Sequence, residues 1–323
     1  MSNFLTDLPN DLVYIDMAPE FRQGYWFGEE VIIAPKRGKR PHENEDNSSL
    51  SEPHLKRSEI GLRLINEPAI DQIEDIDGNW IVKSILNGFP TITEDNTKAK
   101  GKQEIIIDTP EIDKNFEDLD IGQLVNLFGF YQARSRALSR VPGIRYISIF
   151  KNQGIHSGAS IAHPHTQVFA LERIPEKIQR QHRQLLRLDS SNPIQDTIEQ
   201  ELSQATRLVT QTDQWVVFCP YASINPMEVW LIPLRGILEF SHLDHREIIQ
   251  LTGLISPLVK RLGNSGIDFN LLIENGFTHP DRLIIKLVPR GLINSGGLEL
   301  STNIIINPVS PESATSWYKQ GYL

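Results

Sequence analysis

The chain carries the same run of predicted elements twice, and this repeat constrains its fold more than any other feature. Each copy begins with a tryptophan-led strand and ends with a strand that follows Gly-Ile: WIVKSILNGFP (80–90) and GIRYISIFKNQG (143–154), then WVVFCPYASINP (215–226) and GIDFNLLIENG (266–276). The spacing is preserved, since Glu104 and Phe116 are 12 residues apart, as are Glu228 and Phe240. We interpret the match as an internal duplication.

The pattern within each copy predicts strands that flank one helix. EIIID and EVWLI are β-branched and apolar, which is typical of strands. Asp120 and Asp244 each precede apolar residues at helical spacing, with Gln or Glu three residues later, which indicates a capped helix. The predicted fold class is therefore α+β, with one antiparallel unit and its packed helix used twice.

Two segments fall outside the repeat. Residues 41–60 are polar and patternless, and we expect a loop there. Residues 175–212 are rich in Gln, Arg and Leu and predict helices, interrupted at DSSNP, that connect the two halves. We accordingly divide the chain into an N-terminal unit, residues 1–172, and a helical connection with the C-terminal unit, residues 173–323.

Charge and cysteine content exclude several classes of function. A net charge of −9 argues against broad binding to nucleic acid or anionic membranes, although it allows a small basic pocket for a phosphorylated ligand. The single Cys219 excludes an intrachain disulfide, fits a reducing compartment, and is interpreted as a buried apolar residue. No signal-peptide core and no apolar run of ~18–20 residues is found, so we expect a cytoplasmic protein.

The stretch GASIAHPHTQVFAL (158–171) holds the residues best suited to chemistry. On a strand His163, His165 and Gln167 share one face, because side chains alternate. Pro164 cannot donate to a ladder, which predicts that this strand lies at a sheet edge or leaves the sheet there. An open edge would let a ligand approach.

The segment before this strand predicts a phosphate-binding turn. Ser157, Gly158 and Ser160 lie between two strands, and free N–H groups and hydroxyls in such a turn can hold phosphate oxygens. Asn152, at the end of the preceding strand, is placed to reach a ribose or a phosphate. From HPHTQ alone a satisfied polar patch or a metal pair fits as well as catalysis, and this turn favours catalysis.

A histidine here can act as a nucleophile toward phosphorus. His165 would need one unprotonated ring nitrogen, with the other held as a donor by an acceptor such as a backbone carbonyl of its own strand. Gln167 suits a reaction with a good leaving group, because its amide donates a hydrogen bond without supplying a proton.

At FKNQGIHSGASIAHPHTQ the sequence resembles the galactose-1-phosphate uridylyltransferase family of the histidine-triad superfamily. The resemblance continues through other segments of the chain: IIAPKRGKRPHE (32–43), LNGFP (86–90), EIIIDTPE (104–111), CPYASINPMEVWLIP (219–233) and LVPRGLINSGGLELSTNIIINPVSPESA (287–314). It implies two tandem histidine-triad-like units, in agreement with the repeat.

The resemblance also implies a role for each candidate residue. His165 matches the nucleophile that becomes uridylylated, and Gln167 matches the residue that stabilises this intermediate. Positions that match substrate contacts are Arg37 and Arg40 at the phosphates, Asn87 at the nucleotide, and Asn152, Ser157, Gly158 and Ser160 in the phosphate-binding segment. The cluster PKRGKRP has a simpler interpretation as solvated basic surface.

The implied reaction is ping-pong transfer of a nucleotidyl group through His165. UDP-glucose and galactose 1-phosphate are the default pair by family, which implies galactose metabolism, and a homodimer is compatible. One alternative is a nucleotide-sugar phosphorylase of the ADP-glucose type, or a dinucleotide phosphorylase or adenylyltransferase, in which inorganic phosphate is the acceptor. Others are an inactive nucleotide-binding relative and a metal-dependent hydrolase.

The chain departs from the family at its metal ligands. Many members hold zinc with a Cys-x-x-Cys pair, a histidine after TPE and the first histidine of HxH. Here no cysteine precedes Cys219, Ile112 follows TPE, and only His163 is retained. One ligand does not bind structural zinc, so we expect no cofactor, with His42 and His54 as the only alternative ligands.

The second unit lacks a nucleophile of its own. Sliding the first unit onto it by 123 residues places Lys286, Val288 and Arg290 at the positions of the HPHTQ side chains. The family's second-half histidines are replaced by Arg282 and Ile284. We therefore expect one active site per chain, with Lys286 or Arg290 either structural or charged partners of an acceptor phosphate.

Overall fold

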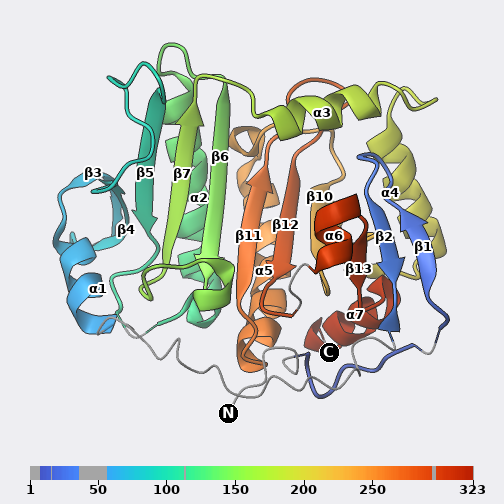
Figure 1. Cartoon of the computed structure of the whole chain (residues 1–323). Coiled ribbons are helices and arrows are strands. Elements are labelled where there is room, and N and C mark those ends of the chain that lie inside the picture. The colour runs from blue at the N-terminus through green and yellow to red at the C-terminus, as the bar shows by residue number, and fades with distance from the viewer. Residues whose placement is uncertain (1–7, 16, 36–56, 113, 293–295, 323) are drawn as a thin grey trace.

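The computed structural model describes residues 8–15, 17–35, 57–112, 114–292 and 296–322. One large sheet forms its centre, with α2 and α5 behind it and smaller elements in front of its C-terminal half (Figure 1). The helices are α1 (Arg57–Asn66), α2 (Ile121–Ser139), α3 (Glu176–Leu185), α4 (Pro193–Gln204), α5 (His245–Asn264), α6 (Gly297–Thr302) and α7 (Pro311–Lys319).

Ten antiparallel strands form the large sheet, in the order β3-β4-β5-β7-β6-β11-β12-β10-β9-β8. They are β3 (Ala69–Glu74), β4 (Trp80–Leu86), β5 (Gly101–Ile107), β6 (Tyr146–Gln153), β7 (His165–Leu171), β8 (Leu208–Gln211), β9 (Trp215–Phe218), β10 (Val229–Pro233), β11 (Phe269–Glu274) and β12 (Ile284–Pro289). A separate sheet joins β1 (Glu20–Gln23), β2 (Glu30–Ile33) and β13 (Ile305–Asn307).

The strand order confirms the predicted duplication and the α+β fold. From its centre outward, one half of the large sheet reads β6, β7, β5, β4, β3 and the other reads β11, β12, β10, β9, β8. Each half therefore repeats the same succession of strands. In the chain, α2 lies between β5 and β6, and α5 lies at the equivalent place between β10 and β11. The two halves join where β6 pairs antiparallel with β11, so they form one continuous sheet.

The two long helices begin where their caps predict. The Asp120 side chain accepts from the backbone N–H of Gln123, and Asp244 forms a complete capping box with Glu247. The Gln123 side chain instead donates to the carbonyls of Ile81 and Asp108, so α2 is bonded to the segments beside β4 and β5. Both helices bury their apolar faces in the main core behind the sheet.

The front of the sheet is covered differently in its two halves. Over the C-terminal half, α3, α4 and the β1–β2 turn pack on the strands, with Trp26 stacked on Trp230 at 5.4 Å between ring centroids. Over the N-terminal half, α1 packs against β4 and β5, and Lys83 donates to the carbonyls of Ile65 and Glu67 at its end. This leaves part of the front of β7 and β6 only half-buried.

Three sequence predictions need correction or completion. Strand β7 lies between β5 and β6 and not at an edge, and it begins at His165, directly after Pro164. Residues 57–60 belong to α1, where we expected a loop, while residues 41–56 lie outside the described part of the chain. The predicted helical connection is confirmed as α3 and α4, with the break at residues 186–192, but it ends at Gln204, and Leu208–Gln211 form β8 of the large sheet.

Candidate active site

His165 stands at the start of β7 with its ring oriented by its own chain. Its Nδ1 lies 2.9 Å from the backbone oxygen of His163, and since a carbonyl only accepts, Nδ1 carries the proton. In the neutral ring Nε2 is then the unprotonated nitrogen. The side chain is 5% exposed. The backbone carbonyl that the nucleophile hypothesis required is therefore present, two residues before His165 and just outside β7.

The surroundings of His165 favour its neutral form. Burial lowers the pKa of its imidazole, and the positive charge of Lys151 lowers it further. The Lys151 Nζ atom is 3.1 Å from the His165 carbonyl oxygen and 2.7 Å from Asp108 Oδ2. A neutral imidazole at neutral pH is the form that can attack phosphorus.

This arrangement predicts the pH dependence of covalent chemistry at His165. The folded pKa lies below the ordinary histidine value of about 6.5, so we expect the rate of adduct formation to fall on acidification with a midpoint below that value. The same lowered pKa contributes stability above pH 6.5, and this is lost as pH falls toward the folded pKa. Single-turnover rates from pH 5 to 8 test it, and a midpoint at or above 6.5 would contradict it.

A buried polar network lies behind His165, on the opposite face of β7. Asp108 Oδ2 accepts a hydrogen bond from Lys151 Nζ. The Tyr131 hydroxyl is 3.3 Å from Asp108 Oδ1 and 2.5 Å from Thr166 Oγ1. Sequence reasoning missed this network. Its one visible signal was Lys151 within the otherwise apolar strand YISIF-K, since a lysine at such a position is rarely buried unless it is paired.

The turn after β6 has the backbone that its glycines predict. Gly154 and Gly158 have φ angles of 84° and 88°, which disfavour any residue with a side chain. A Cβ at Gly154 would also lie 1.8 Å from Asp268 Oδ1, and the other oxygen of Asp268 accepts from the His156 N–H. The C-terminal unit therefore fixes the turn that belongs to the N-terminal unit.

Asn270 of β11 is a second residue of the C-terminal unit that bonds to this turn, and sequence analysis missed it. Its Nδ2 donates to Asn152 Oδ1 at 2.8 Å and to the Ser157 carbonyl at 2.9 Å. Asn152 in turn donates to the Gly158 carbonyl at 3.3 Å. Asn152 is directly opposite Asn270 across the β6–β11 pair, so the junction of the two units is what holds this predicted phosphate contact.

Removing the Asn270 carboxamide is expected to weaken the turn without removing a predicted catalytic group. We expect Asn270→Ala to slow adduct formation about tenfold, because two partly buried hydrogen bonds are lost. Asn264→Ala, at an exposed position near the end of α5, is the matched control. Equal rates for both variants in single-turnover assays would show that Asn270 does not organise the turn.

The structure brings some predicted residues together and separates others. His165, Gln167 and Asn152 share the front of β7 and β6. The turn joins the end of β6 to the start of β7, at the lower end of the molecule in Figure 1. Two predicted serines differ: Ser157 is buried and its hydroxyl donates to the Gly154 carbonyl at 2.6 Å, whereas Ser160 is exposed.

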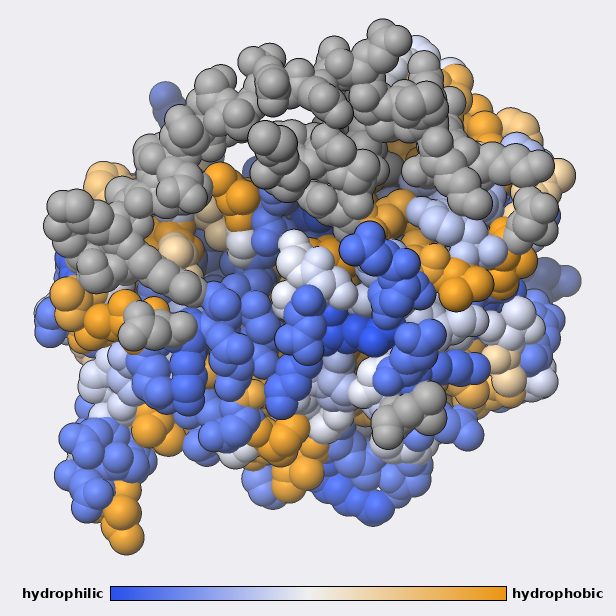
Figure 2. Space-filling model, turned by 90° about the horizontal axis from the view of Figure 1, so that it is seen from below, coloured by the Kyte–Doolittle hydropathy of each residue, from blue (hydrophilic) through white to orange (hydrophobic). Residues whose placement is uncertain are grey.

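The remaining predicted contacts lie farther away or cannot be placed. Asn87 follows β4, two strands from β7, and its side-chain oxygen accepts from the Phe89 N–H. Arg37 and Arg40 lie outside the described residues. Seen from below, the end of the molecule where β7 begins is largely hydrophilic wherever it is not drawn in grey (Figure 2). A polar surface at this end suits a phosphorylated ligand.

The residues around His163 do not fit the zinc ion that the family implies. The His163 ring is fully buried and its Nε2 donates to the Thr109 carbonyl at 2.9 Å. A Cβ at Gly61 of α1 would lie 3.6 Å from both His163 and Ile112, so α1 packs on the two side chains. Within the described ranges no three His, Cys, Asp or Glu residues group as metal ligands; His42 and His54 are outside those ranges.

Because side-chain packing, and not a set of metal ligands, surrounds His163 in the described part of the chain, we can predict how the protein responds to chelation. We expect purified protein to contain well under one zinc per chain, and dialysis against a chelator to leave both its thermal unfolding and its adduct formation unchanged. Elemental analysis of the protein before and after dialysis measures this. Stoichiometric zinc, or a loss of stability on chelation, would contradict it and would direct attention to His42 and His54.

The register of the central strands corrects the predicted equivalence of the two units. Gln167 pairs with Phe150, Phe150 with Leu272, and Leu272 with Lys286, so these four side chains form one row on the front of the sheet. Rotation about the middle of this row exchanges β6 with β11 and β7 with β12, and it brings Lys286, and not Arg290, onto the position of Gln167. The 123-residue slide was wrong because it assumed no gap after Asn275. The segment between β11 and β12, residues 275–283, is shorter than the segment between β6 and β7, residues 154–164.

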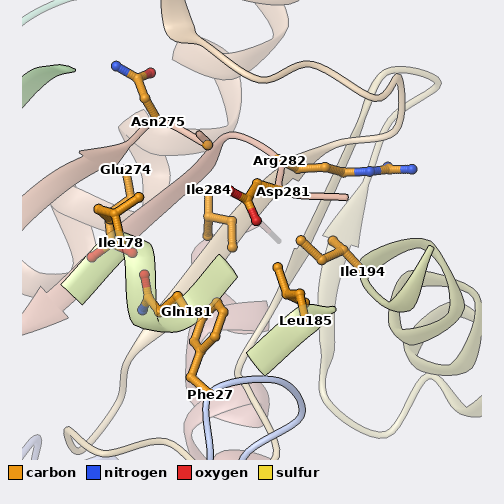
Figure 3. Close-up of a pocket in the computed structure, with 11 residues that line it drawn as sticks. Phe27, Ile178, Gln181, Leu185, Ile194, Glu274, Asn275, Asp281, Arg282 and Ile284 are labelled. Atoms are coloured by element: carbon orange, nitrogen blue, oxygen red, sulfur yellow. The ribbon is translucent and has the colours of Figure 1, made fainter. Parts of the chain in front are cut away.

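In this register Ile284 occupies the position of His165 in the C-terminal unit. Figure 3 shows Ile284 in a pocket with Leu185 of α3 and Ile194 of α4, and all three belong to one apolar cluster. Lys286 is buried and its Nζ lies 2.7 Å from Glu274 Oε2. In the C-terminal unit an apolar side chain therefore occupies the position of His165, and the charge of Lys286 is paired with that of Glu274.

Comparison with known proteins places these features in a family. Residues 91–175 match the family model described as galactose-1-phosphate uridyl transferase, N-terminal domain. The galactose-1-phosphate uridylyltransferase of Haemophilus influenzae is 24% identical over 72% of this chain and 71% of its own length. The ADP-glucose phosphorylase of Arabidopsis thaliana is 27% identical over 92% of this chain and 91% of its own.

The chain is a divergent relative of the galactose-1-phosphate uridylyltransferase family. The crystal structure of the Arabidopsis ADP-glucose phosphorylase with bound ADP-glucose has the same fold, with a TM-score of 0.76, 24% identity, and coverage of 94% of this chain and 99% of that one. The predicted relationship to this family is confirmed. No helix in the described ranges is both long and apolar enough to span a bilayer.

Proposed function

We propose that this uridylyltransferase relative transfers a nucleotidyl group through a covalent intermediate on His165 Nε2. The observation that carries the proposal is the bond between His165 Nδ1 and the His163 carbonyl, because it holds the proton of the neutral ring on Nδ1 and leaves Nε2 as the lone-pair nitrogen. Burial and Lys151, which lower the pKa of His165, support the same state.

The proposed reaction has two displacements at one phosphorus atom. In the first, Nε2 of His165 attacks the α-phosphorus of a nucleotide sugar, a P–N bond forms, and the P–O bond to the sugar phosphate breaks. The sugar 1-phosphate leaves as a stable anion, so no strong general acid is needed. In the second, a phosphate oxygen of the acceptor attacks the same phosphorus, and the P–N bond breaks to restore neutral His165.

Two substrate pairs are candidates. The first is UDP-glucose with galactose 1-phosphate, as in the uridylyltransferase relatives, whose family model matches the segment that contains His165. The second is ADP-glucose with inorganic phosphate, and it is favoured by the similarity to the Arabidopsis ADP-glucose phosphorylase along nearly the whole chain. Both use the same chemistry at His165 and differ in the base and in the acceptor.

One experiment separates these candidates. The protein is incubated with UDP-glucose or with ADP-glucose and its intact mass is measured, so that a UMP or an AMP adduct names the base. The isolated adduct is then exposed to galactose 1-phosphate or to inorganic phosphate, and the acceptor is the one that removes the adduct. No adduct with either donor, in protein that calorimetry shows to bind the nucleotide, would instead identify a binding protein without transferase activity.

A further inference from the structure

The side chain of Gln103 on β5 is bonded to that of Gln167 on β7. Gln103 Nε2 donates to Gln167 Oε1 at 3.2 Å, and Gln103 Oε1 accepts from the backbone N–H of Thr91 at 3.0 Å. The Thr91 hydroxyl is 3.3 Å from the same oxygen. Gln103 is 5% exposed, and the three bonds are partly buried on the front of the sheet.

The backbone N–H of Thr91 decides which atoms donate and which accept in these hydrogen bonds. A backbone N–H can only donate, so the atom of Gln103 that faces Thr91 must be its oxygen. The amide nitrogen of Gln103 then faces Gln167, whose side-chain oxygen must accept the hydrogen bond. The orientation of the Gln167 carboxamide, which no local feature of β7 decides, therefore follows from Thr91.

The segment that holds Thr91 is itself fixed to the sheet. Thr93 accepts from Gly101, the first residue of β5, and donates to the Ala99 carbonyl. A Cβ at Gly101 would lie 2.5 Å from the Ala170 carbonyl of β7 and 2.7 Å from the Ile92 side chain, so the start of β5 packs closely against both β7 and this segment. The donor that begins the chain of bonds is thus held in place by β5, beside the strand of His165.

We propose that Gln103 is a positioning residue that makes Gln167 present its amide nitrogen to the nucleotidyl phosphate. Among the described residues Gln167 Nε2 has no protein acceptor, so it is available to donate to a phosphate oxygen. With the carboxamide reversed, its oxygen would face the anionic phosphate and repel it. This inference rests on the proposed nucleotidyl transfer at His165, and it assigns a role that sequence similarity had not indicated.

Replacing Gln103 with glutamate tests the direction of the bond chain. The carboxylate still accepts from Thr91, but its second oxygen cannot donate, so Gln167 must turn its nitrogen toward residue 103 and away from the substrate. We expect Gln103→Glu to slow adduct formation about 100-fold and Gln103→Met, which leaves Gln167 free to rotate, about tenfold. Lys102→Gln, next on the strand, makes the same change in net charge and is the control.

A double-mutant cycle separates positioning from a general structural effect. In a Gln167→Met background there is no carboxamide to orient, so Gln103→Glu is expected to change the rate of adduct formation by less than about twofold. If it has the same effect in both backgrounds, its effect does not pass through Gln167 and the proposal is overturned. Thermal unfolding of each variant shows which of them are folded, and Gln103→Met serves where the glutamate is not tolerated.

A readout that needs no turnover keeps this inference distinct from the proposed function. The side-chain amide protons of Gln103 are expected to exchange slowly with solvent in labelled wild-type protein, and at least tenfold faster in Gln167→Met. Unchanged exchange would overturn the bond, whatever the activity. Absence of any adduct in the wild-type protein, with the exchange effect present, would instead overturn nucleotidyl transfer and with it the catalytic purpose of the bond.

Discussion

Replacing His165 with alanine is expected to abolish adduct formation while the protein stays folded. The proposed reaction has no other nucleophile, and in the described residues the equivalent position of the second unit is Ile284. Loss of a nucleophile in other enzymes lowers turnover by on the order of 10⁴- to 10⁶-fold, and we expect a value in this range. Intact mass after incubation with UDP-glucose and ADP-glucose, together with steady-state turnover, measures both consequences.

His242→Ala is the matched control for this experiment. It removes an imidazole that is exposed and lies beyond the back of the sheet, so we expect full adduct formation. The ring of His165 is almost fully buried, and its loss also removes packing, so thermal unfolding of His165→Ala must be measured beside its activity. A folded His165→Ala that still gains a UMP or AMP adduct would place the nucleophile elsewhere.

Replacing Lys151 with methionine is expected to produce the largest loss of stability among single changes near the site. Lys151 and Asp108 form an ion pair in which both side chains are fully buried. The methionine leaves the Asp108 carboxylate without its cation, and breaking such a pair costs about 3–5 kcal/mol of unfolding free energy. Urea unfolding measures it, and Lys98→Met, at an exposed position, is expected to change the value by less than about 0.5 kcal/mol.

The same substitution is expected to move the pH profile of His165. Lys151 is one of the causes that lower the pKa of this imidazole, so its removal raises that pKa. Adduct formation in Lys151→Met should therefore decline at a higher pH than in the wild-type protein as the solution is acidified. A destabilised variant with an unchanged profile would show that Lys151 supports the fold alone.

The repeat of strands and helices was predictable because its signals are local. β-branched runs, apolar residues at helical spacing, and the caps at Asp120 and Asp244 act within a few residues of the chain. The strand that begins at His165 was also visible, since His165 and Gln167 alternate along it and share a face; His163, predicted on the same strand, lies in a bend just before it. These signals led to the family before any geometry was known.

Which strand lies at an edge, and which residues of the two units correspond, depended on long-range pairing. Because proline lacks the ladder donor, Pro164 suggested either an edge strand or a strand that leaves the sheet there. The first alternative is wrong, since β7 pairs on both sides, and the second is confirmed, since β7 begins only at His165. The equivalence of Gln167 with Lys286 required the registers of three strand pairs. No local pattern contains that information.

The amino-acid sequence by itself determined the duplicated α+β unit, the capped helices and the strand that presents His165, because each follows from interactions between near neighbours in the chain. Only the tertiary structure decided how that histidine is surrounded. Gln103 and Asn270 reach the site from strands distant in sequence, and Lys151 meets Asp108 in the core behind it. Such contacts depend on which strands pair and in which register, and that is settled by the packing of the whole sheet.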